Sequence, residues 1–478
     1  MKRLIFTFLG LSFLLLPFSC SNELDINRNP LAATTANPNA LLPTLLVDYS
    51  NRRTTEIGSR CADVYQHVSA TFNSPRLGSV ASTLSGNMWS TWYQSILGNL
   101  SLIEKDSRTA GSTSNNVTAI VVTLKALAFF DLTCMFEDIP FTEALKPQEF
   151  PTPKFDSQQL VLNGLVQMLD EAIALIDNMP ATGNFNVSSG DLIYGGNMDS
   201  WRRYARSLQL RVLMLIRNKD TSVDSKIVSI IGENRFITSS PALFRYAGPL
   251  GNRNGWNAIL TSFFTPSNEE SEVWGPSPVI RDILFNANDP RLDLWCTPGA
   301  NGQYESSPIG TFPDASVALY RDRLISPNLP DIWFLPSEVS FYKAELTVKG
   351  VLPGGLSAAD VFYKQGLTEI FNFWNATIPG VTSYSNRIAT YVSGRSIAAM
   401  TNSNALIEIG NQQYLESFWR PIEGWNTVRR NNVPIIDAAP GATISTMLKR
   451  FPYPPNEIAP NPNVPGNKNT DVKMWFEN

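Results

Sequence analysis

Apolar residues recur at helical spacing over long stretches of the chain, and this pattern constrains the fold more than any other feature. Between residues 156 and 177 they stand three or four positions apart, at Val161, Leu165, Met168, Ala172 and Leu175. Residues at this spacing share one face of an α-helix. The spacing repeats over 200–217, and further helices are expected over 88–105, 116–135, 337–350, 358–373 and 404–419. The pattern predicts a mostly α protein.

Two local signals refine these helices and their surroundings. Ser357 and Asp360 have the spacing of a capping box, which places a helix start near Ala358. Between residues 236 and 335 the helical period is lost, and Gly, Pro, Asn and Ser are dense, which predicts long loops with short strands. We expect one domain over 46–478, with a helical scaffold in 46–235 and 336–435, the loop-rich region 236–335, and a Pro- and Asn-rich tail over 450–478.

The first residues have the pattern of an export signal. A basic start, an apolar run and Ser19 precede Cys20, which predicts a signal peptide over 1–19. Cleavage before Cys20 leaves an N-terminal cysteine that can carry several acyl chains, and together these anchor a protein stably to a membrane. Pro-containing pairs such as Asn29-Pro30 and Asn37-Pro38 favour an extended tether over 20–45. We therefore expect a lipid-anchored protein.

Charge and cysteine content exclude several classes of function. The chain has 38 Lys and Arg against 42 Asp and Glu and contains no basic stripe, so nucleic-acid binding is not expected. Cys61, Cys134 and Cys296 show no zinc-site spacing, and His67 is the only histidine. We expect no metal and no cofactor.

Several motifs occur in an order that resembles the SusD/RagB family. They are Cys20 with Asn27 to Pro30, Trp89-x3-Tyr93, Glu137 to Phe141, Asp191 to Gly196, Trp201 to Arg211, Asn288 to Leu292, Ser337 to Leu346, and Trp425 to Glu457. The resemblance implies a helical scaffold of four degenerate tetratricopeptide-like pairs joined to an irregular, loop-rich half with short strands. It also implies an outer-membrane lipoprotein that faces the cell exterior. Such a protein captures an oligosaccharide or a peptide for a TonB-dependent, SusC-like transporter.

Aromatic residues in loop-like sequence are the candidates for ligand binding, because ring faces can stack on a sugar or a peptide and binding residues concentrate in loops. In an early loop they are Tyr65, His67 and Phe72, together with Arg76. Trp89 and Trp92 stand at a helix start reached by the same kind of loop, and Trp256, Trp274 and Trp295 lie in the loop-rich region. Each has an alternative interpretation as a core residue. Trp201, Trp419 and Trp425 lie on apolar helix faces and are assigned to the core.

Three other functions stay open on the sequence alone. A glycan hydrolase needs only two carboxyl groups at the right separation, and sequence does not show that separation. A periplasmic binding protein would lack the acyl anchor, and a structural surface protein would bind no oligomer. The binding interpretation predicts no catalytic residue.

Overall fold

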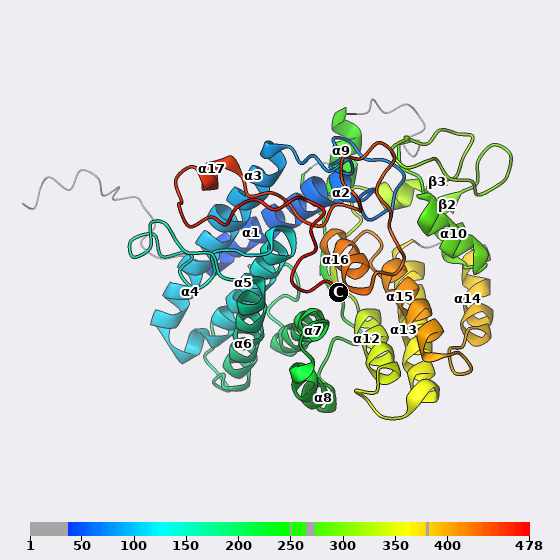
Figure 1. Ribbon diagram of the computed structural model, residues 1–478. Helices are drawn as coiled ribbons and strands as arrows, with labels where there is room; N and C mark the ends of the chain where they lie inside the picture. Colours follow the sequence, from blue (N-terminus) through cyan, green and yellow to red (C-terminus); the bar gives the residue numbers. More distant parts are fainter. Residues whose placement is uncertain (1–36, 249–250, 264–272, 379–381) are drawn as a thin grey trace, which may run out of the picture. The chain divides into compact units, whose positions relative to one another are not determined.

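Helices make up most of the structure, as the sequence predicts (Figure 1). The computed structural model describes residues 37–248, 251–263, 273–378 and 382–478. Residues 37–478 form one compact unit. The expected signal peptide and Cys20 lie outside the described residues.

The first half of the chain consists of helices joined by loops. They are α1 (Pro38–Arg52), η1 (Arg53–Gly58), α2 (Ser59–Cys61), α3 (Ser82–Ser90), η2 (Thr91–Leu97), α4 (Gly98–Ala110), η3 (Ser112–Ser114), α5 (Asn115–Phe136), α6 (Gln158–Asp177), α7 (Met198–Arg217), η4 (Thr221–Val223) and α8 (Asp224–Glu233). Here α6 and α7 confirm the two predicted amphipathic helices. The Ser157 side chain caps α6 by accepting a hydrogen bond from the Leu160 N–H, at 3.4 Å.

Helix α5 forms the core of this half. It packs against α4 and against α6, which in turn packs against α7. Both α5 and α6 are long and apolar enough to cross a membrane, but the apolar window of α5 is 94% buried inside the fold and that of α6 is 39% buried. Near-complete burial marks α5 as a core helix, whereas α6 buries one face and exposes the other. The assignment of these helices to tetratricopeptide-like pairs stays a prediction.

The region from 236 to 335 contains the short strands that the sequence predicts. β1 (Ala242–Phe244) pairs antiparallel with β4 (Asp331–Phe334), and β2 (Cys296–Thr297) pairs with β3 (Leu319–Tyr320). The region also contains α9 (Gly255–Phe263), α10 (Pro278–Asn286), α11 (Arg291–Trp295) and η5 (Asp322–Ile325). The short helices were not predicted, since each is too brief to show a period among the flanking Gly and Pro residues.

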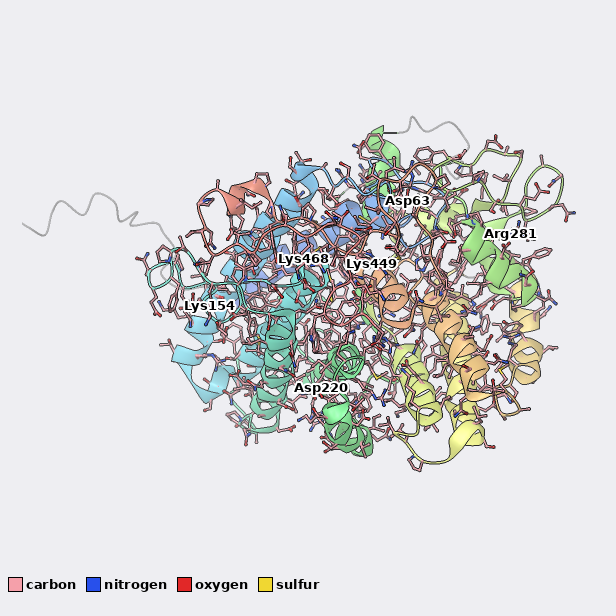
Figure 2. The ribbon with its side chains drawn as sticks, in the orientation of Figure 1. Asp63, Lys154, Asp220, Arg281, Lys449 and Lys468 are labelled. Carbon is pink, nitrogen blue, oxygen red and sulfur yellow. The ribbon has the colours of Figure 1, made fainter. Side chains whose placement is uncertain are left out.

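The last part of the chain returns to helix. It comprises α12 (Pro336–Val348), α13 (Gly355–Thr377), α14 (Thr382–Gly394), α15 (Asn402–Glu416), α16 (Pro421–Asn431) and α17 (Pro455–Ile458). α12 packs against α13 and α15, and α17 lies beside α3 (Figure 1). The tail crosses the first half of the chain, where the Phe451 N–H donates to the Met135 carbonyl at 2.8 Å. Lys449 and Lys468 mark this crossing in Figure 2.

Two local predictions are wrong. Residues 38–45 belong to α1 rather than to an extended tether, because Asn37 caps the helix and Pro38 occupies its first position, where proline is favoured. The capping box is also absent, since α13 already begins at Gly355. Instead, the Asp360 carboxylate accepts hydrogen bonds from the Ile397 N–H at 2.7 Å and the Ser396 hydroxyl at 2.9 Å.

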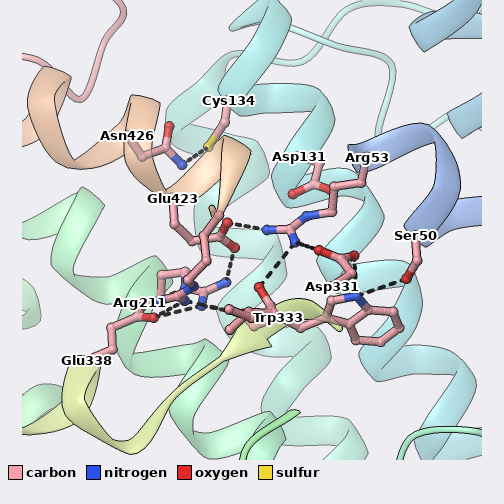
Figure 3. Close-up of polar contacts among 12 residues, drawn as sticks. Ser50, Arg53, Asp131, Cys134, Arg211, Asp331, Trp333, Glu338, Glu423 and Asn426 are labelled. Carbon is pink, nitrogen blue, oxygen red and sulfur yellow. Dashed lines mark hydrogen bonds and ion pairs between the residues drawn. The ribbon is translucent and has the colours of Figure 1, made fainter. Parts of the chain in front are cut away.

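Buried ion pairs join the two ends of the chain (Figure 3). The Arg53 guanidinium binds Asp331 of β4 at 2.8 Å and also contacts Glu423 of α16. Arg211 of α7 binds the same Glu423 at 2.9 Å and Glu338 of α12 at 2.7 Å. All these side chains are less than 8% exposed. One carboxylate, Glu423, therefore connects η1, α7 and α16.

We predict that Glu423→Gln lowers the free energy of unfolding by about 3 kcal/mol, because it removes the charge that two buried guanidinium groups share. Denaturant titration measures the change. Glu171→Gln is the matched control, because Glu171 binds Arg108 at the surface and both side chains are more than 40% exposed. The control is expected to change the free energy by less than about 1 kcal/mol. Equal losses in the two variants would contradict the role of Glu423.

Candidate functional site

An open cleft of about 720 Å³ lies where three segments distant in sequence meet. η2 and α4 form its floor, the loop over 140–153 forms one wall, and the tail over 456–461 forms the other. Binding sites for small ligands have volumes of about 300–1,000 Å³. The cleft is therefore large enough for several sugar or amino-acid residues.

Aromatic rings line the cleft and are held in place by the surrounding chain. The indole N–H of Trp89 donates to Glu457 Oε2 at 3.2 Å, and its ring stacks 5.8 Å from Phe155. The Tyr93 hydroxyl donates to the Pro140 carbonyl at 2.7 Å. Burial raises the pKa of this hydroxyl, so it remains a neutral donor. Phe150 adds a third ring on the loop wall.

The floor presents polar groups along one helix face. Gln94, Gly98, Ser101 and Lys105 are three or four residues apart and all line the cleft. Gln94 and Lys105 are exposed, and neither side chain forms a hydrogen bond to any other described residue. At Gly98 a Cβ atom would contact only the Tyr93 carbonyl oxygen, at 3.4 Å. The missing side chain leaves room above the floor for a ligand.

The carboxylates that line the cleft accept hydrogen bonds from other groups of the chain. Glu457 accepts hydrogen bonds from Trp89 and from the Asn461 amide at 2.9 Å, and Glu143 accepts one from the Lys154 N–H at 2.9 Å. Among the residues that the structure describes, no His or Cys lines the cleft. Over the described ranges, no cluster of three His, Cys, Asp or Glu could hold a metal ion. The arrangement suits stacking and hydrogen bonding with a ligand.

The predicted tryptophans of the loop-rich region lie elsewhere, packed against aromatic rings. Trp256 stacks on Trp419 at 4.2 Å and meets Trp274 edge-on at 5.0 Å. Trp295 stacks on Phe418 at 4.0 Å. Their placement in loops was wrong for Trp256, which lies in α9, and for Trp295, which ends α11. All three indoles are buried, so a ligand could reach them only after a rearrangement, and their role in binding stays a prediction.

Tyr65 and His67 belong to the same buried region. The two rings meet edge-on at 4.9 Å, and the His67 ring lies 4.6 Å from Tyr414. Burial lowers the pKa of His67 to about 3, so the ring stays neutral at physiological pH. Its Nε2 lies 3.2 Å from the Tyr414 carbonyl oxygen. Both side chains pack in the core in this structure.

The other candidates lie in three different places: near the surface, in the cleft and in the core. Phe72 and Arg76 are half-buried, and Arg76 binds the buried Asp63 at 3.2 Å. Burial raises the pKa of Asp63 to about 6. Trp89 is the one predicted residue that lines the cleft, whereas Trp92 is fully buried 5.6 Å from Tyr49. The structure therefore does not gather the predicted residues into one site.

Sequence reasoning missed most of the cleft. Tyr93 stands four residues after Trp89, and Gln94 and Lys105 belong to a second helical spacing with Gly98 and Ser101, so both patterns were visible in the sequence. Phe150 lies between Pro147 and Pro151, and a ring beside prolines was the available signal. No local sequence pattern indicated the wall around Glu457, because this wall comes from the far end of the chain.

Comparison with known proteins places the chain in a family. The model of the SusD-like family, described as "Starch-binding associating with outer membrane", matches residues 29–454. A solved structure of a chitin-binding protein is similar with a TM-score of 0.78 and 21% identity, covering 92% of this chain and 100% of that one. A SusD-like protein described as "Bacteroidetes AC2a" gives 0.76 at 17% identity, with the same coverage.

A SusD homologue from Bacteroides fragilis gives a TM-score of 0.72 at 20% identity, covering 92% of this chain and 99% of the homologue. No curated protein matches the sequence. The solved structures share the fold, and the family model spans most of the chain. The protein therefore belongs to the SusD-like family, as its motifs indicated.

Proposed function

We propose that the protein binds a glycan without cleaving it, at the outer face of the outer membrane, and passes it to a TonB-dependent, SusC-like transporter. The cleft carries this proposal, because it combines fixed aromatic rings with unpaired polar groups on one helix face. The family description and the similarity to a chitin-binding protein support a glycan as the ligand.

Sugars fit the chemistry of this cleft. Each pyranose ring has an apolar face of C–H groups that stacks on an aromatic ring, and its hydroxyl groups both donate and accept hydrogen bonds. Tyr93 and Phe150 supply rings, while Gln94 and Asn99 supply side-chain amides. A peptide is the alternative ligand, and a binding screen with both classes decides between them.

Binding without cleavage agrees with the hydrogen bonds that the carboxylates of the cleft already accept. Glycoside hydrolysis requires one carboxyl group as an acid and a second as a base or nucleophile. Glu457 and Glu143 each accept hydrogen bonds from other groups of the chain, as described above. These contacts hold both groups as structural acceptors within the walls.

The anchor and the transporter complete the proposal. Acyl chains on Cys20 would hold the protein at the membrane, and the residues before α1 would act as its tether. A large glycan bound at the cell surface needs a route across the outer membrane. The SusC-like transporter that the family implies supplies that route.

We predict that Gly98→Leu lowers glycan affinity at least about tenfold, because the new side chain occupies the open space above the floor. The helix is expected to tolerate the change, since glycine costs about 1 kcal/mol in a helix interior. A glycan array identifies the ligand, and calorimetric titration with that oligosaccharide measures the affinity. Peptides are titrated in parallel.

Gly232→Leu is the matched control for this experiment. Gly232 is an exposed helical glycine in α8, and a Cβ atom there would meet nothing within 4 Å. It does not line the cleft. The control is expected to bind as the wild-type protein does. Wild-type affinity in Gly98→Leu would show that the ligand binds elsewhere.

We predict that Cys20→Ser abolishes fatty-acid attachment, because the hydroxyl cannot replace the thiol to which the lipid is joined. Metabolic labelling with an alkyne-tagged fatty acid measures the attachment. Ser21→Ala, at the adjacent position, is expected to keep the label. Label retained in Cys20→Ser, or absent from the wild-type protein, would rule out the anchor at Cys20.

A further inference from the structure

One carboxylate holds both ends of a long loop in the tail, which we call the strap and define as residues 451–467. Lys468, labelled in Figure 2, follows the strap directly and binds Glu137 Oε2 at 2.6 Å. Arg450, just before it, contacts the same oxygen. The Trp475 N–H donates to Oε1 of this carboxylate at 2.8 Å. The strap therefore leaves and rejoins the body of the protein at Glu137.

Further hydrogen bonds close the base of the strap. The Lys449 N–H donates to the Thr470 carbonyl at 2.7 Å. Within the strap, the Tyr453 N–H donates to Asn467 Oδ1 at 2.9 Å. These bonds bring the two ends of the strap together beside the C-terminal end of α5.

The far part of the strap forms one wall of the cleft. Glu457 binds Trp89, and the Asn461 amide donates to the Pro153 carbonyl at 2.9 Å. Asn463 donates to the Thr152 carbonyl at 2.8 Å. Asn456 also donates to the Ser90 hydroxyl at 3.2 Å. These side-chain hydrogen bonds hold the far part of the strap, while Glu137 holds its base.

Glu137 itself has a fixed geometry. It follows the last residue of α5 with a φ of 74°, in the left-handed region that favours glycine. The Thr133 hydroxyl donates to its carbonyl oxygen at 2.6 Å. Burial opposes ionisation of the carboxyl group, but the hydrogen bonds from Arg450 and Lys468 outweigh it and lower its pKa. The carboxylate is therefore ionised at neutral pH.

We propose that Glu137 is a positioning residue for ligand binding, because it holds the strap in the place where the strap forms a wall of the cleft. Glu137 does not line the cleft and acts only through the strap. This inference rests on the proposed function. If Glu137 has this role, loosening the base of the strap weakens ligand binding. The effect is indirect, because the ligand touches neither Glu137 nor Lys468.

The test uses two variants of the full-length protein. Lys468→Met removes the ion pair between Lys468 and Glu137. The Lys468 side chain is 46% exposed, so the variant is expected to fold. Glu137→Gln removes the shared charge and leaves Arg450, which is 4% exposed, without its carboxylate partner. The control is Lys473→Met, the same change at an exposed tail lysine outside the strap.

Hydrogen exchange, followed by mass spectrometry, measures how often the backbone of the strap opens. Titration with the array-identified oligosaccharide measures the affinity. Lys468→Met is expected to speed exchange in residues 453–467 and to weaken affinity about two- to five-fold, the range of an exposed ion pair. Glu137→Gln is expected to produce larger changes in the same direction. Lys473→Met is expected to change neither measurement.

Unchanged exchange in both variants, or faster exchange with unchanged affinity, would overturn the role of Glu137. If the wild-type protein bound no glycan, the proposed function would fail. The exchange rates would still show whether Glu137 holds the strap, so the two failures are distinguishable.

Discussion

The fold depends on charges that are buried together. Removing a guanidinium or a carboxylate from water is costly, and the cost is offset only when each charge meets its partner in good geometry. Glu423 satisfies this condition for Arg53 near the start of the chain and for Arg211 in the middle. Arg430 and Glu345 add another buried pair, at 2.8 Å. These contacts fix the late helices α12 and α16 against α7 and η1.

That scaffold in turn positions the cleft. α5 packs on the α4 floor on one side and on α6 on the other, and its C-terminal end carries Glu137. The same helix therefore supports the floor and holds the base of the strap. A ligand site made of three segments can be rigid in this way even though each wall is a loop, because each loop is tied to a buried element.

The sequence predicted the long helices because their period depends on local spacing, as in α6 and α7. It also indicated the family, through motifs spread along the chain. It could not place Trp256 or Trp295, because a ring among Gly and Pro residues gives the same local pattern on a surface loop and in an irregular core. Trp256 is buried by Trp419, which is distant in sequence. The cleft was missed for the same reason, since its walls come from segments that meet only in the folded protein.

A crystal structure with the array-identified oligosaccharide bound shows where the ligand lies. Sugar rings are expected in the cleft, against Tyr93 and Phe150, with hydroxyl groups in reach of Gln94 and the strap. Sugar bound instead at the loop around Phe72 and Arg76, with the cleft empty, would contradict the proposed site.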